Sequence, residues 1–72
     1  MKDELKQQFA LRITQANKSE LVVILYEMFL TYIGDAKDDL KDQDLKTFCL
    51  NIQRARGCLK ELMASLNYNY EP

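Results

Sequence analysis

The 72-residue sequence lacks histidine and tryptophan altogether. It has only two glycines, one proline and two cysteines. Without histidine, the chain lacks the commonest general base and metal ligand that works near neutral pH. Because glycine and proline are scarce and hydrophobic residues make up 47% of the chain, the sequence predicts an all-α protein. A chain of this length buries only about 60% of the surface that it exposes when unfolded, so we expect one small domain that needs reinforcement.

Cysteine usage, charge and hydropathy narrow the class of protein further. Cys49 and Cys58 would lie about 180° apart around one helix, too far for a disulfide, and are expected to be buried or reduced thiols. Ten basic and eleven acidic residues give a net charge of −1, which argues against a nucleic-acid partner. The apolar stretch from Leu21 to Ile33 is interrupted and too short to span a bilayer, and residues 1–16 lack the apolar core of a secretory signal. The sequence thus predicts a cytoplasmic protein without membrane insertion.

An acidic stretch is the strongest candidate for a chemical site. It lacks the alternate-residue ligands, the central glycine and the final glutamate of a calcium loop, so a solvated acidic turn is the better interpretation. No nucleophile stands beside a base that would activate it. The sequence therefore predicts no catalytic, metal-binding or cofactor-binding residue, and no enzyme. The acidic residues concerned are Asp35, Asp38, Asp39, Asp42 and Asp44.

Residues 18–41 are predicted to form the first long helix. Asn17 can cap it, and Glu20, three residues later, completes a capping box. Apolar residues cover roughly 220° of its circumference, against the ~100° or more of an ordinary surface helix, so we expect partners on at least two sides. Its central stripe is expected to consist of Val22, Leu25, Phe29, Ile33, Ala36 and Leu40.

A second long helix is predicted for residues 45–67, after a short turn in which Asp42 or Asp44 suits the positive end of the helix. Matched lengths and a short turn predict an antiparallel hairpin. We also expect a short or mobile helix within residues 1–16, where the apolar spacing fits an extended chain too, and a tail at residues 68–72. The hairpin core is expected to contain Val22, Leu25, Phe29, Ile33, Leu45, Phe48, Ile52, Ala55, Leu59, Leu62 and Leu66.

Two stretches of the sequence resemble the FliS family of flagellar export chaperones. The first is Ser19-Glu20-Leu21 followed by Leu25-Tyr26-Glu27, which is similar to the family's entry into its first long helix. The second and more specific stretch is NIQRARGCLKELMASLN, residues 51–67. The residues that match the family pattern there are Asn51, Arg54, Ala55, Leu59, Glu61, Leu62, Ser65, Leu66 and Asn67.

The resemblance covers residues 14–67 and departs from the family in two places. Lys18-Ser19 stands where the family usually has proline or glycine, and Met28 stands where it has a small residue. The chain also ends where the family's third helix would begin. We therefore expect the hairpin to be half of a four-helix bundle, completed by dimerisation or by missing C-terminal helices of a longer protein, and we predict a homodimer.

The resemblance implies a cytoplasmic chaperone of bacteria that binds the disordered C-terminal segment of flagellin in an apolar groove and prevents its premature polymerisation. The alternative function is a structural or regulatory hairpin module whose apolar face serves only self-association. Phe29 is assigned to the core, whereas Met28 and Tyr32 fit the core and the client surface equally well. The helical wheel and the resemblance together indicate as client-binding residues Leu21, Ile24, Tyr26, Met28 and Tyr32.

Overall fold

The computed structural model describes residues 1–69, and the side chains of residues 1–66. Within these residues the protein is all-α, as predicted, and its helices are α1 (Asp3–Gln15), α2 (Lys18–Lys41) and α3 (Leu45–Asn69). The bounds of α2 coincide with those expected from the sequence, whereas α3 continues two residues past the expected end. The expected tail therefore begins later than residue 68, and residues 70–72 lie outside the described part.

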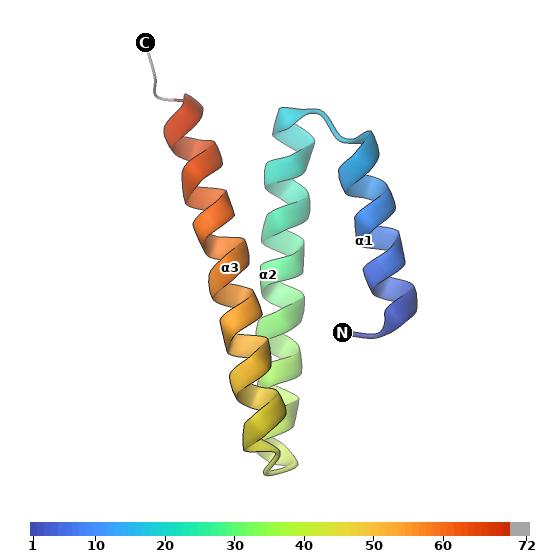
Figure 1. Cartoon of the computed structure of the whole chain (residues 1–72), viewed down its shortest axis with the longest axis vertical. Helices are drawn as coiled ribbons and strands as arrows, with labels where there is room; N and C mark the ends of the chain where they lie inside the picture. Colours follow the sequence, from blue (N-terminus) through green and yellow to red (C-terminus); the bar gives the residue numbers. More distant parts are fainter. Residues whose placement is uncertain (70–72) are drawn as a thin grey trace.

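The three helices lie side by side in a single layer, with α2 in the middle (Figure 1). α2 and α3 run antiparallel as a hairpin, and α1 runs antiparallel to α2 along its other side. The molecule measures 47 × 24 × 13 Å along its principal axes, so it is about one helix thick. A four-helix bundle needs a second layer, and residues 1–69 do not supply one.

Polar side chains fix where the two long helices begin. Oδ1 of Asn17 accepts a hydrogen bond from the backbone N–H of Glu20 at 2.9 Å, which is the cap expected from the sequence. Of the two aspartates considered for α3, Asp44 is the cap, because its Oδ1 accepts from the backbone N–H of Thr47 at 3.2 Å. Between the helices, Gln43 adopts φ = 59°, a left-handed conformation that reverses the chain within a short turn.

The hairpin core is a cluster of Tyr32, Ala55 and Cys58, against which Met28 and Phe29 also pack. Asn51 is buried beside this cluster and donates a hydrogen bond to Asp39 across the hairpin. The buried positions recur at helical spacing along each long helix. They are Ile24, Tyr32 and Ala36 on α2, and Asn51, Ala55, Cys58 and Leu62 on α3.

Each long helix buries a different side from the predicted stripe. The prediction was wrong for five residues assigned to the central stripe or the hairpin core, whose side chains are exposed: Ile33 at 39%, Leu40 at 51%, Leu45 at 64%, Leu59 at 43% and Leu66 at 47%. Ala36, Ala55 and Leu62 are buried, as expected. The other residues assigned to the hairpin core are half-buried, namely Val22, Leu25, Phe29, Phe48 and Ile52.

The position of α1 explains this difference. α1 buries Phe9 and packs beside Ile24, so α2 has neighbours on two sides of its broad apolar arc. At 100° per residue, the line through Ile24, Tyr32 and Ala36 lies roughly 60° around the helix from the predicted stripe. The buried side of α2 is therefore centred between its two neighbours rather than on the middle of its apolar arc.

Candidate binding surface

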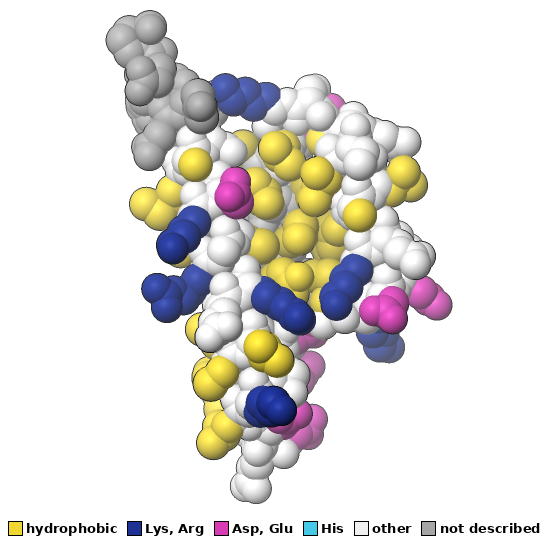
Figure 2. Space-filling model, viewed as in Figure 1, with side chains coloured by type: hydrophobic (Ala, Val, Ile, Leu, Met, Phe, Trp, Pro, Cys, Tyr) yellow, Lys and Arg dark blue, Asp and Glu magenta, His cyan; other side chains and the backbone are white. Residues whose placement is uncertain are grey.

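Four of the five predicted client-binding residues lie along one side of α2. Leu21, Ile24, Met28 and Tyr32 follow one another at spacings of three, four and four, which places them in one line, here called the inner line. Ile24 is 3% exposed and Tyr32 is 8% exposed, whereas Leu21 and Met28 are half-buried. Apolar side chains gather over α2 between α1 and α3, with basic side chains at the lower edge (Figure 2).

The fifth predicted residue, Tyr26, lies elsewhere. Its position on the helix is about 150° around from the centre of the inner line, and its side chain is 55% exposed. The structure therefore separates Tyr26 from the other four residues. It shares its side of α2 with Ile33 and Leu40, both of them exposed.

The inner line is covered by the N-terminal part of the chain. Phe9 is the buried residue of α1 and is 5% exposed. Met1 packs against the cluster of Tyr32, Ala55 and Cys58. Removing this N-terminal cover would leave Ile24 and Tyr32 open to solvent or to another chain.

Polar contacts between the N-terminal part and α2 are few. The guanidinium of Arg12 lies 2.6 Å from Oε2 of Glu27, but both side chains are nearly half exposed, and such pairs contribute only about 0–1 kcal/mol. The same guanidinium lies 5.6 Å from the centre of the Phe9 ring. The ammonium group of Met1 lies 2.8 Å from Oδ2 of Asp35, whose side chain is about one third exposed. The cover is thus held by a small apolar contact and by the ion pair of Met1, whose side chain is 1% exposed, with Asp35.

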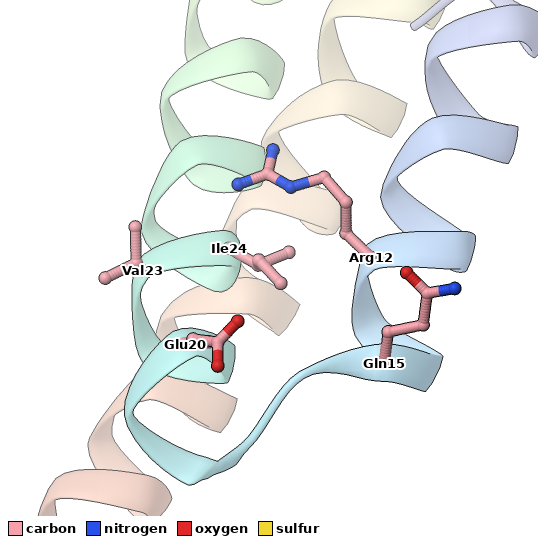
Figure 3. A pocket seen from close by; sticks show the side chains of 5 residues that line it. All are labelled: Arg12, Gln15, Glu20, Val23 and Ile24. Carbon is pink, nitrogen blue, oxygen red and sulfur yellow. The ribbon is translucent and has the colours of Figure 1, made fainter.

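A small hollow opens where α1 turns into α2 (Figure 3). Ile24 points from α2 into this hollow and Arg12 reaches over it from α1. The other residues that line it are Gln15, Glu20 and Val23. Its volume is about 240 Å³, below the roughly 300–1,000 Å³ of typical small-molecule sites. The hollow fits one or two apolar side chains of a bound polypeptide better than a cofactor.

Sequence reasoning missed Phe9 and Asn51 as buried residues, and it did not distinguish Cys58, which is buried, from Cys49, which is exposed. Burial raises the pKa of the Cys58 thiol, and the nearby carboxylate of Glu61 raises it further, so this thiol is protonated and unreactive at neutral pH. Cys49 is exposed, and neither thiol forms a disulfide. The buried side of α3 could have been recognised from a spacing of four, three and four residues, which joins Asn51, Ala55, Cys58 and Leu62. Because asparagine is polar, Asn51 was not counted among the apolar positions that define this spacing.

Two features are absent from the described residues, a cluster of metal ligands and a membrane-spanning helix. No three histidine, cysteine, aspartate or glutamate side chains there lie close enough together to hold a metal ion. None of the described helices has the length and apolar character needed to cross a membrane.

Comparison with known protein families gives one match. The model of the family described as "Flagellar protein FliS" matches residues 1–71, almost the whole chain. Neither the curated proteins nor the solved structures contain a match. The family match extends the resemblance of residues 14–67 to the N-terminal cover. The chain therefore belongs to the FliS family of flagellar export chaperones.

Proposed function

We propose that this protein is a cytoplasmic chaperone that binds the disordered C-terminal segment of flagellin along the inner line of α2 and so prevents premature polymerisation. The observation that carries the proposal is an apolar line, Leu21 to Tyr32, under a cover that buries only one side chain of its helix. An amphipathic client segment can place its apolar residues at the same helical spacing in such a groove.

The free energy of client binding is the difference between the contacts that the client makes with the inner line and the contacts that the N-terminal cover loses. Fully burying a side chain such as Phe9 contributes about 1.5–3 kcal/mol, and the exposed pair of Arg12 and Glu27 adds little. A client that covers the inner line would gain several contributions of this size from the burial of its own and the line's side chains. The loss of conformational entropy when the disordered segment becomes ordered offsets about 2–5 kcal/mol of this gain. The contacts of the client must also offset the loss of the ion pair between Met1 and Asp35 when the N-terminal cover is displaced.

Calorimetric titration with a peptide of the host flagellin's C-terminal segment tests this proposal. We expect saturable binding that Met28→Asp abolishes, because an aspartate would place an unpaired charge in the groove. Leu30→Asp is the matched control, since Leu30 is 49% exposed on the same helix and outside the inner line. Phe9→Ala should tighten binding, because it weakens the cover with which the client competes. A folded wild type that does not bind the peptide would refute the proposal.

A second candidate function is a structural or regulatory hairpin module that only self-associates. The exposed side chains of Ile33, Leu40, Leu45, Leu59 and Leu66 support it, because large apolar side chains that are exposed together usually meet a partner. Under either function we propose a homodimer that forms a four-helix bundle from two hairpins. A dimer that does not bind the flagellin peptide would favour the second candidate function.

A further inference from the structure

A second apolar surface, separate from the inner line, runs along the hairpin. We call it the outer stripe and define it by seven exposed side chains on α2 and α3. Their exposed fractions range from 39% for Ile33 to 64% for Leu45. Half-buried Phe29 and Ile52 lie between them by helical position. The outer stripe consists of Tyr26, Ile33, Leu40, Leu45, Leu59, Met63 and Leu66.

The outer stripe lies on the side of the hairpin that faces away from the N-terminal cover. On α2, the ammonium of Met1 meets Asp35, and Ile33 lies about 160° around the helix from that position. On α3, Met1 packs against the cluster that includes Cys58, and Leu59 lies 100° further around, beyond the seam at Ala55. Both rows of exposed side chains therefore belong to one face, two helices wide, which α1 leaves open.

The size of this face indicates a permanent partner. Seven large apolar side chains, each about half exposed, present on the order of 700 Å², more than the largest patch of roughly 300–600 Å² on a typical monomer. A standard interface buries about 800 Å² on each partner. The outer stripe together with its half-buried neighbours is therefore large enough to be one side of a stable interface.

We propose that the outer stripe is the contact face of a homodimer, in which two hairpins pack face to face around a two-fold axis. This inference rests on the homodimer proposed above and not on client binding. A face two helices wide matches a second copy of itself, because an isologous interface requires only one self-complementary surface. Two antiparallel hairpins packed in this way form a four-helix bundle, and the inner line of each copy remains on the outside.

Charge at the edges of the outer stripe predicts how the dimer responds to salt. Lys37 on α2 and Arg56 and Lys60 on α3 lie beside the stripe, and no acidic residue of the two helices shares that side. Two copies therefore bring like charges near one another at the rim of the interface. Because salt screens such repulsion, the dimer should tighten as ionic strength rises. A partner helix with acidic residues along its edges would instead bind less tightly as ionic strength rises.

Sedimentation equilibrium of the client-free chain at micromolar concentration tests the proposal. We expect a dimeric mass for the wild type and at least a ~10-fold higher dissociation constant for Met63→Glu, because a carboxylate replaces an apolar contact at the interface. Leu45→Glu is a second variant with the same expectation, since Leu45 is the most exposed residue of the stripe. Leu30→Glu is the control on α2, and circular dichroism confirms that each variant is helical.

Three results would overturn the proposal. One is a monomeric wild type, and another is a dimer that neither Met63→Glu nor Leu45→Glu weakens. The third is a wild-type dimer that dissociates as sodium chloride is added. If a monomeric wild type binds a synthetic amphipathic helix of leucine and glutamate, the outer stripe belongs to an acidic partner instead. Since no flagellin peptide is present, none of these results depends on the proposed client.

Discussion

The side-chain amide of Asn51 donates a hydrogen bond of 2.7 Å to Oδ2 of Asp39 and so joins α3 to α2 near the closed end of the hairpin. Asn51 is 4% exposed and Asp39 is half-buried. A buried polar group without a partner carries a desolvation cost, so this bond favours one axial alignment of the two helices. An apolar seam alone would tolerate alternative alignments more readily.

Asn51→Leu should lower the free energy of unfolding by about 1.5–3 kcal/mol, because the carboxylate of Asp39 loses its donor. Urea denaturation measures the loss. Gln53→Leu, at an exposed position on the same helix, should change stability by less than about 0.5 kcal/mol. The double variant Asp39→Leu/Asn51→Leu should recover most of the loss, since neither polar group remains unpaired. Equal effects of Asn51→Leu and Gln53→Leu would contradict this role.

Phe9→Ala should release α1 from the hairpin while α2 and α3 stay folded together. Phe9 is the buried residue of α1, and the remaining contacts of α1 include the exposed pair of Arg12 and Glu27. Hydrogen exchange should accelerate strongly in residues 3–15 and little in residues 45–66. Leu11→Ala, at a 57% exposed position of α1, is the control. Uniform acceleration along the chain would mean that α1 is an integral part of the cooperative core.

Gln43→Gly should stabilise the protein by about 1 kcal/mol. Gln43 holds φ = 59°, where a side chain is strained and glycine is not. The same substitution at Gln53 in the interior of α3 should destabilise by about 1 kcal/mol, because glycine there only adds freedom to the unfolded chain. Thermal unfolding of both variants gives opposite shifts in Tm if the turn is as described, and shifts of the same sign if it is not.

Stability should fall as the pH rises above about 8, owing to Cys58. Its pKa is raised in the folded protein by burial, and further by Glu61, above the ordinary thiol value of about 8.5. At higher pH the unfolded chain loses this proton while the folded chain keeps it, so ionisation favours unfolding. Urea midpoints between about pH 7 and 9.5 measure the slope. Cys58→Ala should flatten it, whereas Cys49→Ala, at an exposed thiol, should leave it unchanged.

The sequence was a good guide to where the helices begin and end, because local chemistry determines these points. Asn17 was expected as a cap and accepts the backbone N–H of Glu20, whereas the sequence offered both Asp42 and Asp44 for the start of α3, and Asp44 is the cap. The antiparallel hairpin followed from helix lengths and from a short acidic turn. None of these inferences required knowledge of what each helix packs against.

The sequence could not determine which side of each long helix is buried. An apolar arc of roughly 220° on α2 allows several choices, and the neighbours of α2 decide among them. α1 supplies the missing neighbour through Phe9, although its weak periodicity gave little sign of it. For the same reason the prediction of client-binding residues mixed two sides of α2: it contained all four residues of the inner line together with Tyr26, which lies on the other side.

The layer formed by α1, α2 and α3 is about one helix thick, and this thickness affects how the sequence can change over evolutionary time. Met28 on the inner line and Ile33 on the outer stripe belong to opposite sides of the same backbone rather than to one shared interior. Substitutions on the two sides therefore have few partners in common, and their energetic effects add. If both proposals hold, one side of α2 can diverge to follow a changing client sequence while the other continues to specify how the chains assemble.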